Sequence, residues 1–383
     1  MASRFRSISI AIVFLMTIGS TEIAHSQLWP FAIGARPAAP APLACLGTSN
    51  PNERTVENQL VNPARGSFAW AWRQPATLAN YTRACQAERL AAQRAVAPIN
   101  NGNLGVARTV AAFHQAGLSR ACIRAAIVSR ANDNIPLNRV NRKVCTPTMR
   151  ELDTTPCMTE NYVNYTHFTI NSAVRCMSSP GNEINPDILF GMINNESAFM
   201  GFVQYSGGVG LMQLTSVAAR EVFNDGQAGR AHLDEMMSRP QKRAFCDPFR
   251  HLISEVPERA DLNNCAWFGM NNGVPRNVIA GVALLSFYLK TMKEHIESKG
   301  ISRSHRNFQL IAEQLALVAY NAGPNAARLV LDKLGAGATA RSSDPALLIR
   351  NGATRWARNT YLTDIRSHAA DVPNRPASCW ETP

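Results

Sequence analysis

Two stretches decide the fold of this chain: Asn-Asn-Glu-Ser-Ala-Phe at residues 194–199, and Gly-Gly-Val-Gly-Leu-Met-Gln-Leu-Thr at residues 207–215. A third stretch, Ala-Tyr-Asn-Ala-Gly-Pro, lies much later at residues 319–324. In the first of them, Glu196 ends an apolar helical pattern and is followed by a glycine-rich turn. A single carboxyl group in such a place is suited to acid/base chemistry.

The residues before Glu196 predict a helix with a defined start. Asn185 has a side chain that caps a helix, and Pro186 is favoured at the first helical position. The apolar residues that follow recur at helical spacing, namely Ile188, Leu189, Met192 and Ile193. Glu196 then falls in the last turn, near the negative end of the helix dipole and beside apolar residues. Both effects are expected to raise its pKa, as a general acid near neutral pH requires.

The glycines after this helix predict a loop in which backbone can approach a ligand closely. Residues 207–210 are not a phosphate-binding loop, because no Lys-Ser or Lys-Thr pair follows them. Further helices are expected to begin at residue 211 and at residue 277, and to cover residues 308–320. Residues 346–349 and 356–365 are expected to close the domain.

The N-terminus predicts export. Two arginines precede an apolar stretch at residues 8–18 that is too short to span a membrane, and the small residues at 24–26 suit a signal peptidase. Residues 1–26 are therefore expected to be a signal peptide, which leaves no integral membrane segment in a periplasmic or secreted mature chain. An uncleaved membrane anchor is the alternative. Cys45 lies too far beyond the apolar stretch to be a lipidation site.

The cysteines fit an oxidising compartment. All nine lie beyond residue 26, and the odd number leaves at least one thiol unpaired. Pairing Cys157 with Cys176 and Cys246 with Cys265 closes the shortest loops, but the sequence leaves the connectivity open. No metal site is expected, because the chain has no Cys-x-x-Cys motif and its eight histidines show no ligand spacing.

The net charge of +12 favours polyanionic partners. For an exported protein these are acidic cell-wall polymers or membrane surfaces before nucleic acid, and a solvated basic surface is the alternative. No run of Lys and Arg interleaved with aromatic residues predicts a nucleic-acid groove, and the sequence points to no protein partner.

The chain divides into four parts. Residues 1–26 are the expected signal peptide, and residues 27–45 form a linker rich in Pro and Ala. Residues 46–157 have helical spacing but no catalytic pattern, and residues 158–383 hold the stretches described above. The fold class expected is all-α.

Residues 160–370 resemble the catalytic domain of the soluble lytic transglycosylase family, which has a lysozyme-like α-helical fold and cleaves the glycan strands of peptidoglycan. The resemblance rests on four blocks that occur in the same order. These blocks are Glu196-Ser197-x-Phe199, Gly210-Leu211-Met212-Gln213, Asn277 with Gly281, and Ala319-Tyr320-Asn321-Ala322-Gly323.

The resemblance implies a role for each matching residue. Glu196 would be the catalytic acid/base, and Gln213 and Ser206 would line the saccharide groove. The hydroxyl of Tyr320 would hold the Glu196 carboxyl group, and Asn321 would fix the turn beside the substrate. The alternative for Tyr320 and Asn321 is that they only end a helix. No cofactor is implied.

This chain departs from the family pattern in several places, among them a loop between Glu196 and Gly210 that is one residue shorter and Ser206 as only an approximate counterpart of the family's groove serine. The usual Met-Pro after Gln-Leu is Thr215-Ser216, and the usual Glu-Thr before a late Tyr-Val is Ala357-Arg358 before Tyr361-Leu362. An insertion around residues 220–276 is longer than the family norm. The change at Ala357-Arg358 removes a carboxylate that often borders the groove.

One carboxyl group favours lytic over hydrolytic chemistry, because hydrolytic glycosidases use two. The resemblance implies that the substrate is the glycan of peptidoglycan, cut between MurNAc and GlcNAc with formation of 1,6-anhydroMurNAc ends. Two alternatives stay open: a hydrolytic muramidase on the same fold, and a wall-binding module without turnover.

Overall fold

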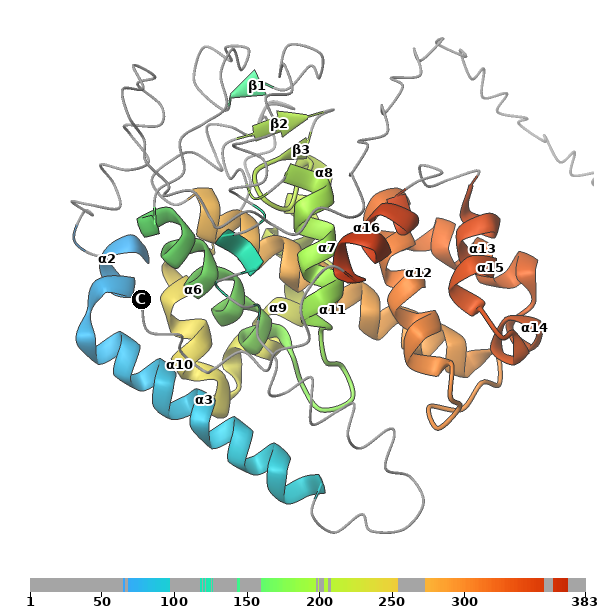
Figure 1. Ribbon diagram of the computed structural model, residues 1–383, viewed down its shortest axis with the longest axis horizontal. Coiled ribbons are helices and arrows are strands. Elements are labelled where there is room, and N and C mark those ends of the chain that lie inside the picture. The colour runs from blue at the N-terminus through green and yellow to red at the C-terminus, as the bar shows by residue number, and fades with distance from the viewer. Residues whose placement is uncertain are drawn as a thin grey trace, which may run out of the picture. The chain divides into compact units, whose positions relative to one another are not determined.

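The core of the chain is built on helix α11, Gly273–Ser298, in which every residue from 277 to 286 is buried. A stretch of helix that is buried on every side belongs in the centre of a bundle. Helices α6 (Glu160–Met177) and α12 (Phe308–Ala322) pack against it. This arrangement, shown in Figure 1, brings together helices that are far apart in the sequence.

The computed structural model describes residues 65, 68–96, 118, 120, 122–124, 126, 143–144, 160–197, 199, 203–205, 208–253, 273–354 and 361–370. All of them belong to one unit, residues 40–383. They are mostly helical with almost no strand, which confirms the all-α prediction for this part of the chain. The expected signal peptide and the Pro/Ala-rich linker lie outside the described residues.

Helix α7, Pro186–Ser197, begins and ends as the sequence predicts. The Asn185 side chain accepts a hydrogen bond from the backbone N–H of Asp187 at 3.0 Å, as a capping residue does. Glu196 lies in the last turn. The helix packs along α16, Tyr361–Ala370, and the pair is seen as green beside red in Figure 1.

Three very short strands lie beyond α7. β2 (Val203–Tyr205) and β3 (Gly208–Val209) form an antiparallel hairpin, in which Gln204 pairs with Val209. β1 (Lys143–Val144) pairs with the other edge of β2, so that a piece of the N-terminal region extends this hairpin.

The helix expected from residue 211 begins at Ser216 instead, as α8, Ser216–Phe223. The reason is Thr215, whose side chain accepts a hydrogen bond from the backbone N–H of Ala218 at 3.2 Å and so caps the helix. Thr215 therefore has a structural role as the N-cap of α8.

Residues 228–252, which lie in the stretch expected to be an insertion, form short helices. They are α9 (Ala228–Ser238), η2 (Pro240–Lys242), α10 (Arg243–Cys246) and η3 (Asp247–Leu252). Both α9 and α10 pack on α6.

Cys176 at the end of α6 forms a disulfide with Cys246 at the end of α10. The predicted pairs Cys157 with Cys176 and Cys246 with Cys265 are therefore wrong. Loop length predicted them, but helix packing brings the Cα atoms of Cys176 and Cys246 within 5.0 Å although 70 residues separate them.

The C-terminal helices cover α12. They are α13 (Pro324–Leu334), α14 (Ala336–Arg341) and α15 (Pro345–Ala353). Both α13 and α15 contact α12.

Helices α2 (Phe68–Arg73) and α3 (Pro75–Val96) come from the N-terminal region. The Phe68 ring is fully buried and packs against the rings of Tyr165, Phe168 and Phe249 at centroid distances of 5.8, 5.8 and 4.9 Å. The described part of residues 46–157 thus contributes to the same hydrophobic core as the later helices. None of the described helices has both the length and the apolar character needed to cross a membrane.

Candidate active site

The carboxyl group of Glu196 is half-buried at the end of α7. Its Oε1 accepts a hydrogen bond of 2.8 Å from the hydroxyl of Tyr361, the first residue of α16. Tyr361 is itself buried, with 2% of its surface exposed. Because α16 packs along α7, the acid is held by a side chain that is 165 residues away in the sequence.

Tyr320 does not make the contact that the resemblance implies. Its hydroxyl donates to the backbone carbonyl of Met212 at 2.8 Å, so the prediction that it holds the Glu196 carboxyl is wrong. It nevertheless lies near the acid. Burial raises the pKa of Tyr320 well above its usual value, and the negative charge of Glu196 and then of Tyr288 raise it further. Tyr320 is therefore a neutral hydrogen-bond donor at neutral pH.

The loop at residues 210–213, called the site loop here, is held from α11. Asn277 is fully buried; its Oδ1 accepts a hydrogen bond from the N–H of Met212 at 2.7 Å, and its Nδ2 donates to the carbonyl of Val209 at 2.6 Å. A buried amide whose oxygen and nitrogen are both bound to backbone fixes the loop in one position.

Glycines make this close approach of α11 and the site loop feasible. A Cβ on Gly281 would lie 2.6 Å from Cβ of Met212, and a Cβ on Gly210 would lie 2.6 Å from Cγ of Asn277. Gly210 also has a φ of +75°, which favours glycine. Two of the sequence blocks therefore pack directly against each other: Gly210 to Gln213, and Asn277 with Gly281.

Gln213 sits at the end of the site loop in a left-handed conformation, with φ +46°. Its Nε2 donates to the carbonyl of Gly210 at 2.7 Å, so the half-buried side chain turns back over its own loop. Its predicted contact with a saccharide stays a prediction.

The C-terminal end of α7 is fixed by residues around Glu196. The Ser197 hydroxyl donates to the carbonyl of Ile193 at 3.2 Å. Phe199 is fully buried with φ +62°, and its ring lies 5.2 Å from that of Phe190. The carbonyl of Phe199 accepts a hydrogen bond from Tyr162 at 2.8 Å. Phe199 is a non-glycine residue held at positive φ three residues after the candidate acid, a conformation that its buried surroundings must impose.

The remaining predicted site residues are less informative. Asn321 is exposed at the end of α12. The turn beside it is closed by Gly323, which has φ +89° and donates its N–H to the carbonyl of Ala319 at 2.8 Å, so glycine fixes this turn. Ser206 lies outside the described residues.

Sequence reasoning missed Tyr361 as the partner of Glu196. The only signal was its place in the late stretch that departs from the family pattern, where Tyr361 and Leu362 follow Ala357 and Arg358. Nothing in local spacing shows that this tyrosine returns to the end of α7.

Chemically, the described part of the site presents one carboxyl group, which is half open to solvent and oriented by a hydroxyl. Such a group can donate a proton and take one back. Within the parts of the chain that the structure describes, no three His, Cys, Asp or Glu side chains gather as metal ligands would. No protein-family model, curated protein or solved structure matches this chain.

Proposed function

We propose that this protein is a peptidoglycan lytic transglycosylase with a lysozyme-like catalytic domain. It would cleave the β-1,4 bond between MurNAc and GlcNAc and leave 1,6-anhydroMurNAc ends. The observation that carries the proposal is the Glu196 carboxyl group at the end of α7, oriented by the Tyr361 hydroxyl at 2.8 Å.

The way the four sequence blocks meet supports the proposal. Asn277 and Gly281 hold the site loop, and Tyr320 binds the carbonyl of Met212 in that loop. The charge of Glu196 acts on Tyr320, which connects the acid to the same group of residues. Blocks that resemble a family in sequence order are thus joined in space around one acid.

In the proposed reaction, Glu196 first acts as an acid and protonates the glycosidic oxygen, so that the bond to the MurNAc anomeric carbon breaks. The N-acetyl group of the substrate stabilises the positive charge on that carbon. Glu196, now a carboxylate, takes the proton of the MurNAc 6-hydroxyl as this oxygen bonds to the anomeric carbon. The proton returns to Glu196, and no water is consumed.

Tyr361 has a defined part in this cycle. Its hydrogen bond to Oε1 restricts the orientation of the carboxyl group, so that the acid is held in place before the substrate binds. The donor serves both halves of the reaction, because it stabilises the carboxylate that forms after the first proton transfer.

The net charge and the disulfide support a cell-wall substrate and an exported protein. The net charge of +12 favours approach to acidic wall polymers, and the disulfide between Cys176 and Cys246 suits an oxidising compartment. Periplasmic or secreted localisation is part of the proposal.

The test is Glu196→Gln assayed on purified sacculi. Release of soluble anhydro-muropeptides is expected to fall by at least ~100-fold, because general acid/base catalysis is lost, while the protein still pellets with sacculi. Glu294→Gln is the matched control, since Glu294 is an exposed residue of α11. It is expected to digest at the wild-type rate. Wild-type release by Glu196→Gln would refute the proposal.

A further inference from the structure

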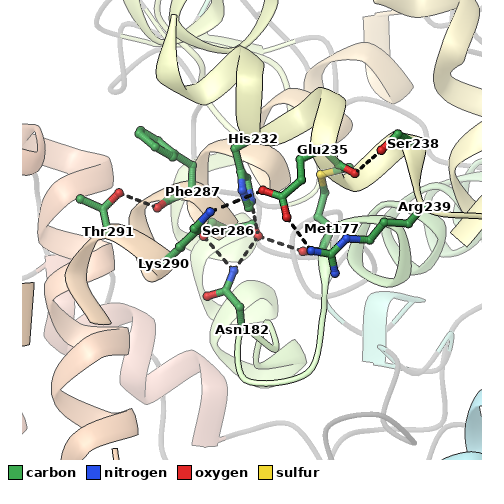
Figure 2. A network of polar contacts seen from close by, with 10 residues as sticks. All are labelled: Met177, Asn182, His232, Glu235, Ser238, Arg239, Ser286, Phe287, Lys290 and Thr291. Atoms are coloured by element: carbon green, nitrogen blue, oxygen red, sulfur yellow. Dashed lines mark hydrogen bonds and ion pairs between the residues drawn. The ribbon is translucent and has the colours of Figure 1, made fainter. Parts of the chain in front are cut away.

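Ser286 joins three separate elements through one buried hydroxyl. The residue lies on α11 with 0% of its surface exposed, and its Oγ donates to the carbonyl of Met177 at the end of α6, at 2.8 Å. The same oxygen lies 3.1 Å from Nδ2 of Asn182 and 2.9 Å from Nε2 of His232 on α9 (Figure 2). Asn182 also donates to the backbone carbonyl of Ser286 at 3.1 Å.

These contacts determine where the proton of His232 lies. A hydroxyl has one hydrogen, and a carbonyl can only accept, so the Ser286 hydrogen belongs to the bond with Met177. Asn182 and His232 must therefore both donate to the Ser286 oxygen. His232 is thus neutral with its proton on Nε2. Its Nδ1 is buried and has no hydrogen-bond partner in the described part of the chain.

A second proton on His232 would be unfavourable. It would place an N–H group at Nδ1, where no described acceptor is in reach, and a positive charge in a ring that is 5% exposed. Burial lowers the pKa of His232 to about 4. Lys290 on α11 and Arg239 just after α9 lower it too, and only Glu235 raises it.

The other neighbours of the ring do not offset this charge. Glu235 is itself bound to Arg239 at 2.6 Å and to Lys290 at 3.4 Å, as Figure 2 shows. From α6 and the turn after it, the nearby groups are the Met177 carbonyl and the Asn182 amide, which are neutral. The ring of Phe287 lies 6.1 Å away.

The Ser286 contacts affect the candidate active site because α11 contacts both the site loop and the turn that leads into α7. Asn277 and Gly281 hold the site loop, and Ser286 lies little more than one helical turn further along. Ser286 holds the turn at residues 178–185, called the connecting turn here, which leads directly into α7. The position of Glu196 relative to the site loop therefore depends on the Ser286 contacts.

We propose that His232 is a positioning residue for Glu196, which keeps the connecting turn in place only while its imidazole ring is neutral. A protonated ring still donates from Nε2, but its charge and its new N–H at Nδ1 have no described partner, so the ring leaves this buried position. Ser286 then loses its contact with His232, the connecting turn is released from α11, and α7 moves relative to the site loop. The effect on the reaction rests on the function proposed above, whereas the release of the turn does not.

The first test is amide hydrogen exchange of the connecting turn as a function of pH. The N–H of Asn182 donates to the Ser179 carbonyl at 2.8 Å and that of Ile184 to the Ser178 hydroxyl at 3.2 Å. Both bonds lie within the turn, so these amides are protected while α11 holds the turn in its fold and should exchange faster once the released turn opens. The released state binds a proton near the ordinary histidine pKa of 6.5, and the held state only near 4. The held state is therefore fully favoured above pH 6.5 and loses ground as pH falls. Between pH 7 and pH 5 the equilibrium should move ~20-fold toward release.

The variant His232→Gln distinguishes the effect of protonating His232 from the effects of protonating other groups at low pH. Its side-chain amide keeps a donor for Ser286 but does not titrate, so the protection of Asn182 and Ile184 should not respond to pH in this way. His251→Gln is the matched control, since His251 is exposed on η3, and it should follow the wild type. The same pH response in His232→Gln as in the wild type would overturn the proposal.

The second test is kinetic. In the wild type, kcat on sacculi should fall between pH 7 and pH 5 with little change in KM, and His232→Gln should lose this decrease. If neither protein digests sacculi, the proposed function fails, but the exchange result still decides the role of His232. An equal loss of kcat in both proteins would refute the positioning role.

A third measurement covers the case in which His232→Gln does not fold. Nitrogen-15 NMR of the histidines in the wild-type protein at pH 7 should show His232 protonated at Nε2 and bare at Nδ1. A proton on Nδ1 at that pH would overturn the proposal.

Discussion

Glu196 and Tyr361 meet although 165 residues separate them, and the chemistry proposed here depends on that contact. A free glutamate side chain samples several rotamers, whereas one bound through Oε1 has a fixed carboxyl plane. The two tyrosines near the acid have different roles. Tyr361 orients the carboxyl group, and Tyr320 binds the carbonyl of Met212 and so orients the site loop.

Replacing each tyrosine by phenylalanine should therefore give different kinetic results. Tyr361→Phe is expected to lower kcat by about 10- to 100-fold, because a hydrogen bond to a charged group contributes ~1.5–3 kcal/mol. The measurement is steady-state digestion of sacculi, with thermal unfolding to confirm that the domain is intact.

Tyr320→Phe is the matched variant. It removes a hydrogen bond to a neutral carbonyl, costs ~1 kcal/mol of folding stability and is expected to raise KM more than it lowers kcat, because the site loop shifts. If Tyr361→Phe retained the wild-type kcat, the orienting role of Tyr361 would be disproved.

The contact between α11 and the site loop permits no extra atom at Gly281. Alanine normally stabilises a helix relative to glycine by ~1 kcal/mol. Here its Cβ would lie 2.6 Å from both Cβ and Cγ of Met212, so the site loop must shift. Gly281→Ala is expected to destabilise the protein by about 1–3 kcal/mol and to reduce turnover, measured by urea unfolding and by muropeptide release.

Gly337→Ala provides the comparison on another helix. Its Cβ would meet only the flexible end of Arg341, at 3.4 Å, at an exposed position of helix α14. This variant should be as stable as the wild type or up to about 1 kcal/mol more stable. Equal stability of the two variants would show that the contact between Gly281 and Met212 is looser than described here.

The elements that follow from short stretches of sequence were predictable, and contacts between distant stretches were not. The start of α7 at Pro186 and the place of Glu196 in its last turn follow from a local cap and from helical spacing. The start of α8 was missed because the weak helical pattern from residue 211 hid the cap at Thr215.

The partner of Glu196 and the disulfide of Cys176 could not be read from the sequence for a shared physical reason. Both depend on which helices pack side by side, α7 with α16 and α6 with α10. Loop length favours pairs that are near in the chain, whereas packing places distant residues together. The hydroxyl of Tyr320 donates to the carbonyl of Met212 and not to the Glu196 carboxyl group, although the charge of Glu196 acts on Tyr320.

The N-terminal helices share a hydrophobic core with the later helices, so a change in an N-terminal helix should destabilise both. Phe68→Ala would remove a fully buried ring that contacts α6 and η3, and should lower the free energy of unfolding by about 3–5 kcal/mol. Chemical denaturation measures this. Leu329→Ala, at a leucine of α13 that is 53% exposed, should change stability by less than about 0.5 kcal/mol. A small effect of Phe68→Ala would mean that residues 46–157 fold separately.

The central claim is that one carboxyl group acts as acid and then as base on a substrate that closes its own ring. The most direct measurement is mass spectrometry of the fragments that the wild-type protein releases from purified sacculi, with Glu196→Gln as the inactive control. Lytic cleavage predicts anhydro ends that are one water lighter than reducing ends. Fragments with reducing ends only would contradict the account, since they require an attacking water and a group that activates it.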